Sequence, residues 1–79
     1  MAKVTIYSTP ICPYCEMTKE YLKKNNIEFE NKDVSEDENS AREMVEKSHQ
    51  LGVPVIDIDG AIIVGFNRPE IDKALGLQK

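Results

Sequence analysis

The chain has 79 residues, of which 41% are apolar and 30% charged, and its formal net charge is −4. This length predicts a single domain over residues 1–79, because domains usually span about 50 to 250 residues. The negative charge argues against a general affinity for nucleic acid, and no apolar run approaches the roughly 18 residues of a membrane-spanning helix. The start of the chain has no apolar signal region, so we expect a cytoplasmic protein that does not enter membranes.

The first predicted element is a short strand at residues 4–7, where apolar and polar residues alternate. A helix is predicted over residues 13–24, and Asn25-Asn26 should end it. Its expected inner face carries residues at helical spacing, namely Tyr14, Met17, Tyr21 and Leu22. Residues 27–34 read as a second short strand.

The second half of the chain predicts a helix, a hairpin and a last helix. Ser35 and Glu38 form a capping-box pattern that should begin the helix, and Gly52 is placed to end it. The apolar runs 53–58 and 61–64 flank Asp59-Gly60, which is a strong hairpin signal. Asn67, followed by Pro69 in the first turn, should begin the last helix.

The element order is therefore βαβαββα, which predicts an α/β fold. The first two strands should be parallel, because a helix joins them, and the hairpin must be antiparallel. We expect a four-stranded mixed sheet flanked by three helices. Ligands of open α/β sheets tend to bind at the carboxyl ends of the strands, so the segment after the first strand is the candidate site.

Both cysteines of the chain lie in that segment, as Cys12-Pro13-Tyr14-Cys15. Side chains three residues apart share a helix face, so the pair can form a disulfide without refolding. Pro13 suits the first helical position, and the amides of Tyr14 and Cys15 remain free to point toward the Cys12 sulfur. These amides and the positive helix end should stabilise a thiolate on Cys12 more than on Cys15. We therefore predict that Cys12 attacks and Cys15 resolves.

Two structural interpretations of the pair are weaker. A zinc site needs about four ligands, and the chain offers two cysteines and the distant His49. A structural disulfide between these cysteines would close a very short loop, and we expect a reducing compartment. No metal site is therefore predicted.

With these residues in place, the sequence resembles the glutaredoxin family, whose members have the thioredoxin fold. The resemblance rests on CPYC after the first strand, Val53-Pro54 at the third strand and Gly65 before the last helix, and it extends over essentially the whole chain. It implies a cis peptide bond before Pro54, packed against the CPYC loop. The activity it implies is thiol-disulfide oxidoreduction that needs no bound cofactor, with glutathione as reductant or co-substrate.

The resemblance also implies a glutathione-binding cleft. Its expected residues are Thr9, Tyr14, Val53, Pro54, Asn67 and Arg68. Thr9 stands where many glutaredoxins have a basic residue, and we expect Arg68 to replace it in part. The expected partners are glutathione and disulfide-containing proteins, and the expected state is a monomer.

Two alternatives remain open. The segment 65–70, Gly-Phe-Asn-Arg-Pro-Glu, is similar to that of glutaredoxin-like redoxins that take electrons from thioredoxin reductase and serve ribonucleotide reductase. The chain would then be such a redoxin. Alternatively, two chains and two glutathiones would hold an iron-sulfur cluster through Cys12. Pro13 disfavours this binding module, because cluster-binding family members more often have a small residue there.

Overall fold

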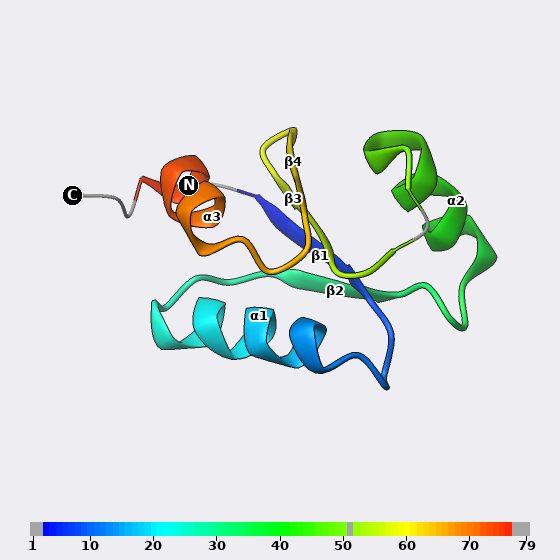
Figure 1. The fold of residues 1–79 in the computed structure, drawn as a ribbon, viewed down its shortest axis with the longest axis horizontal. Helices are drawn as coiled ribbons and strands as arrows, with labels where there is room; N and C mark the ends of the chain where they lie inside the picture. The colour runs from blue at the N-terminus through cyan, green and yellow to red at the C-terminus, as the bar shows by residue number, and fades with distance from the viewer. Residues whose placement is uncertain (1–2, 51, 77–79) are drawn as a thin grey trace.

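The computed structural model describes residues 3–50 and 52–76. Its sheet contains β1 (Val4–Ser8), β2 (Glu30–Asp33), β3 (Val55–Ile58) and β4 (Ala61–Val64), in the order β2-β1-β3-β4 (Figure 1). The β1–β2 pair is parallel, whereas β3 pairs antiparallel with both β1 and β4. The predicted four-stranded mixed sheet is therefore confirmed.

Three helices complete the thioredoxin fold in the predicted order (Figure 1). They are α1 (Pro13–Lys24), α2 (Glu38–Ser48) and α3 (Arg68–Leu75). Leu22 of α1 and Ile71 of α3 pack on one face of the sheet in the main apolar core. Met44 of α2 packs with Tyr7 and Val55 in a second core. Because side chains alternate along a strand, the two cores lie on opposite faces of the sheet.

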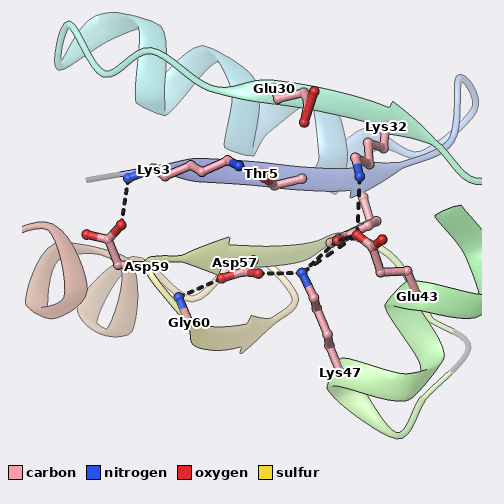
Figure 2. Close-up of a pocket in the computed structure, with 10 residues that line it drawn as sticks. Lys3, Thr5, Glu30, Lys32, Glu43, Lys47, Asp57, Asp59 and Gly60 are labelled. Carbon is pink, nitrogen blue, oxygen red and sulfur yellow. Dashed lines mark hydrogen bonds and ion pairs between the residues drawn. The ribbon is translucent and has the colours of Figure 1, made fainter. Parts of the chain in front are cut away.

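A charged network connects α2 to the sheet (Figure 2). Glu43 accepts a hydrogen bond from the Tyr7 hydroxyl and pairs with Lys32 at 3.2 Å. Lys47, one turn farther along α2, donates to the Tyr7 hydroxyl at 3.0 Å and pairs with Asp57 of β3 at 2.6 Å. The buried Tyr7 hydroxyl thus has both a donor and an acceptor on α2, which removes the cost of burying it.

The ends of α2 differ from the prediction. Ser35 does not cap the helix, because its amide and hydroxyl both donate to Asp33 in the preceding turn. Asp37 caps it instead and accepts the amide hydrogen of Asn39 at 3.0 Å. The helix ends at Ser48, where His49 takes the left-handed conformation with a φ of 60°. Gly52 therefore lies beyond the helix and does not end it.

The inner face of α1 also differs from the prediction. The structure buries Cys15, Thr18 and Leu22, whereas Tyr14 is 61% and Met17 45% exposed. Thr18 can face the core because its hydroxyl donates to the Tyr14 carbonyl at 2.8 Å. Small and polar residues therefore form much of the buried face, which a search for apolar periodicity does not detect.

The second strand is shorter than the predicted range 27–34, since β2 begins at Glu30. Ile27 and Phe29 precede it and pack against the main core. Within the described ranges, no helix is both long and apolar enough to cross a bilayer.

Candidate active site

Cys12 lies between the end of β1 and the start of α1, as the N-cap residue of that helix. Pro13 takes the first helical position, where no partner exists for an amide hydrogen. The Cys12 sulfur accepts the amide hydrogen of Cys15 at 3.2 Å. The Tyr14 amide, which we also expected to donate, makes no such bond in this structure. The sulfur nevertheless lies at the positive end of α1, which favours a negative charge there.

Cys15 is fully buried in the first turn of α1, while Cys12 is partly exposed. Burial, and then the hydrogen bond and charge interaction with Cys12, together raise the pKa of the Cys15 thiol to about 12. The two contributions from Cys12 depend on a free Cys12 sulfur. They are lost once Cys12 enters a mixed disulfide, so reaction at Cys12 makes Cys15 easier to ionise. The site therefore favours reaction at Cys12 first.

A second segment lies beside the cysteines. The Val53-Pro54 peptide bond is cis, as the resemblance implies. The Val53 carbonyl oxygen lies 3.9 Å from the Cys12 sulfur, although 41 positions separate the two residues. Among the described residues, no backbone group pairs with the amide or carbonyl of Val53. A peptide-like ligand can therefore form strand-like hydrogen bonds with Val53 next to the thiol.

A third segment joins the site through Gly65, whose amide donates to the Pro54 carbonyl at 2.8 Å. This bond brings the loop between β4 and α3 to the cis peptide. Asn67 caps α3, accepting the Glu70 amide hydrogen at 3.4 Å, and Arg68 is the first residue of the helix. Both are exposed. The structure thus brings Asn67 and Arg68 toward the site through the loop, without direct contact with Cys12.

The remaining predicted ligands lie on the cysteine segment itself. The Thr9 carbonyl accepts the Cys12 amide hydrogen at 3.4 Å, and the Thr9 side chain is half-buried. The Tyr14 ring is exposed at the start of α1. Both therefore adjoin Cys12 in sequence and in space.

Sequence reasoning missed a groove between α1 and α3, which includes the predicted ligand Arg68. It has a volume of about 240 Å³ and is lined by Met17, Glu20, Tyr21, Lys24, Phe66 and Arg68. The sequence predicts Met17 and Tyr21 on the core face of α1. Met17 is instead half-exposed in the groove, whereas Tyr21 lines the groove and also packs against the main core. Sequence reasoning also missed Ile11, which is 91% exposed directly before Cys12. The signal that the sequence contains is an isoleucine directly before the Cys12-Pro13-Tyr14-Cys15 segment.

In the parts of the chain that the structure describes, no three His, Cys, Asp or Glu side chains gather closely enough to hold a metal ion. The chemistry that this geometry supports is thiol-disulfide exchange. It combines an accessible sulfur at a helix start, a second sulfur three residues on, and a free backbone segment beside them.

Comparison with known proteins gives a consistent assignment. The family model for glutaredoxin matches residues 4–63. The glutaredoxin-like 8.6 kDa protein in the rubredoxin operon of Clostridium pasteurianum is 57% identical over 72 residues, covering 91% of this chain and 96% of that protein. Glutaredoxin 3 of Escherichia coli K12 is 34% identical over 65 residues, covering 82% of this chain and 78% of that protein.

The glutaredoxin-like protein NrdH of Lactococcus lactis subsp. lactis is also 34% identical, over 73 residues that cover 89% of this chain and 96% of that protein. Among solved structures, the thioredoxin-like protein BC3987 matches with a TM-score of 0.85 at 30% identity, covering 91% of this chain and 99% of that chain. The similarity therefore extends to both glutaredoxins and NrdH-type proteins.

Proposed function

The chain belongs to the glutaredoxin family of thiol-disulfide oxidoreductases, and on that basis we propose that it reduces protein disulfides and glutathione mixed disulfides with glutathione as its reductant. The observation that carries this proposal is the position of the Cys12 sulfur. It lies at the start of α1, 3.2 Å from the Cys15 amide nitrogen and 3.9 Å from the Val53 carbonyl oxygen.

In the proposed reaction, the Cys12 thiolate attacks one sulfur of the substrate disulfide, and the other sulfur leaves as a thiolate. Cys15 then loses its proton and attacks the Cys12 sulfur. This step forms the Cys12-Cys15 disulfide and releases the second substrate thiol. Two glutathione molecules return the pair to thiols and become one glutathione disulfide, so two electrons pass from glutathione to the substrate. With a glutathione mixed disulfide, glutathione itself can resolve the Cys12 intermediate.

The backbone of Val53 supports glutathione as the ligand, because the cysteinyl residue of the tripeptide can pair with it beside Cys12. The carboxylates of glutathione need donors. The α3 start offers backbone amides, the positive end of the helix dipole and the Arg68 guanidinium. Thr9 and Tyr14 would complete the cleft on the cysteine side.

A second candidate is a redoxin that takes its electrons from thioredoxin reductase. The segment 65–70 and the 34% identity to the Lactococcus NrdH protein favour it. In that case, Phe66 and Arg68 would contact the reductase. The exposed side chains of Ile11 and Tyr14 give a protein partner an apolar surface next to Cys12.

The test is to measure reduction of the Cys12-Cys15 disulfide in two coupled assays. One contains glutathione, glutathione reductase and NADPH, and the other contains thioredoxin reductase and NADPH. We expect efficient turnover in the first assay, with Cys12→Ser as the inactive control. Efficient turnover only in the second assay would contradict the glutathione proposal and favour the redoxin.

A further inference from the structure

The side chain of Tyr21 connects α1 to both the start and the middle of α3. The guanidinium carbon of Arg68 lies 5.0 Å from the centre of the Tyr21 ring. The Tyr21 hydroxyl donates a hydrogen bond to Asp72, one turn farther along α3. Phe66 meets the same ring edge-on, with 6.0 Å between ring centres. Tyr21 is thus held at its ring and at its hydroxyl, which leaves it little freedom to move.

The Arg68 guanidinium lies over this ring, and its contact with Tyr21 acts to lower the pKa of the Tyr21 hydroxyl. Arg68 is exposed, and among the described residues no carboxylate lies within ion-pair distance of its guanidinium. A guanidinium has five N–H donors, so its contact with one tyrosine leaves several of them free to bind a carboxylate. Arg68 also lines the groove between α1 and α3.

Asp72 is a carboxylate that could pair with Arg68 in place of the substrate. It lies four residues after Arg68 on α3, and oppositely charged side chains at that spacing readily pair on a helix. In the structure, the Asp72 carboxylate instead accepts a hydrogen bond from the Tyr21 hydroxyl. This bond raises the pKa of the Tyr21 hydroxyl, so the hydroxyl keeps its proton and continues to donate.

We propose that Tyr21 is a positioning residue that holds the Arg68 guanidinium ready for a carboxylate of the disulfide substrate. The Tyr21 ring contacts the guanidinium, and the Tyr21 hydroxyl keeps Asp72 from pairing with Arg68. The inference rests on the proposed glutathione function, because it assumes that the substrate has a carboxylate beside the cleft. A side chain that is fixed before binding loses less conformational entropy when the ligand arrives.

The experiment measures the rate constants for reaction of the reduced protein with glutathione disulfide and with bis(2-hydroxyethyl) disulfide, which has no carboxylate. The readout is the rate constant for glutathione disulfide divided by the rate constant for bis(2-hydroxyethyl) disulfide. Tyr21→Leu should lower this ratio roughly three- to tenfold, the range expected for loss of a cation–π contact. Arg68→Gln should lower it as much, and the double variant should show no further loss. The loss should shrink at high salt.

Tyr21→Phe provides a second test in case Tyr21→Leu does not fold. It keeps the ring and removes only the hydroxyl. Without the hydroxyl, Asp72 can pair with Arg68, so the ratio should fall. Adding Asp72→Asn should restore the ratio. Lys23→Gln is the matched control, since it removes an exposed positive charge from α1 outside the groove. It should leave the ratio unchanged.

The outcomes separate this inference from the proposed function. If Arg68→Gln lowers the ratio while the Tyr21 variants do not, Tyr21 is not a positioning residue, although the carboxylate site stands. If Arg68→Gln leaves the ratio unchanged, the carboxylate site and this inference are both wrong. Additive losses in the Tyr21→Leu/Arg68→Gln double variant would also overturn the inference.

Discussion

At the scale of single residues, the two cysteines differ because their surroundings differ. Cys12 is partly exposed at the start of α1, and Cys15 is buried one turn deeper. Burial first, and then the bond to Cys12, raise the pKa of Cys15 to about 12, so this thiol keeps its proton at neutral pH. The thiolate is the nucleophile in thiol-disulfide exchange. Cys15 is therefore suited to a second step that follows loss of the free Cys12 sulfur.

Substitution of each cysteine by serine tests these roles. Cys12→Ser should abolish turnover, because no other sulfur can make the first attack. Cys15→Ser should keep at least part of the activity on a glutathionylated peptide, since glutathione can resolve the mixed disulfide at Cys12. Release of glutathione from the peptide measures both variants. Turnover by Cys12→Ser, or complete inactivity of a folded Cys15→Ser protein, would show that the roles are assigned wrongly.

At the scale of elements, α2 is held to the sheet by charged groups as well as by its apolar core. The Tyr7 hydroxyl and then the Lys32 ammonium hold the pKa of Glu43 below its usual range. Burial alone would raise the pKa of Asp57, but the bonds from Lys47 and the Gly60 amide outweigh it and lower the value. Both carboxylates therefore bind protons less readily in the folded protein than in the unfolded chain.

This difference predicts how stability depends on pH. The stabilisation is present above the unfolded pKa values of about 4 and is lost as the pH falls through the lower folded values. The free energy of unfolding should thus decrease between about pH 5 and pH 2. Glu43→Gln should make this decrease smaller, whereas Glu46→Gln, on the same helix and exposed, should not. Urea denaturation across this range measures both, and equal pH dependence in the two variants would refute the role of Glu43.

The elements also show which features the sequence predicts. Pro13 and Asn25 mark the ends of α1, and Asn67 and Pro69 mark the start of α3, because capping depends on a few neighbouring residues. The predicted start of α2 was wrong because Ser35 can either cap the helix or bond with Asp33. In the structure, its amide and hydroxyl both donate to Asp33. Local patterns predict an element well when only one residue can provide the cap.

The rotation of α1 is harder to predict than its ends. Its buried face combines one leucine with Cys15 and Thr18, while Met17 faces the groove. Which side of the helix meets the sheet depends on how α3 and the β4–α3 loop pack beside it. That arrangement brings Tyr21 to Arg68, a contact across 47 positions that no local pattern contains.

At the scale of the whole molecule, the fold brings together three distant segments. The order of strands and helices was predicted from the sequence, and with it the placement of Cys12 after β1. The approach of Val53 to the Cys12 sulfur came from the family resemblance. The link from Pro54 to Gly65 required the structure, because it depends on how the β4–α3 loop turns back toward the cis peptide.

The central claim is that the folded chain makes Cys12 the reactive thiol and protects Cys15. The most direct test is the rate of alkylation of each cysteine by iodoacetamide at neutral pH, resolved by peptide mass spectrometry in the native protein and in urea. In the native protein, Cys12 should react at least about tenfold faster than Cys15, and in urea the two rates should become similar. Faster alkylation of Cys15 in the native protein, or equal rates in both states, would contradict the claim.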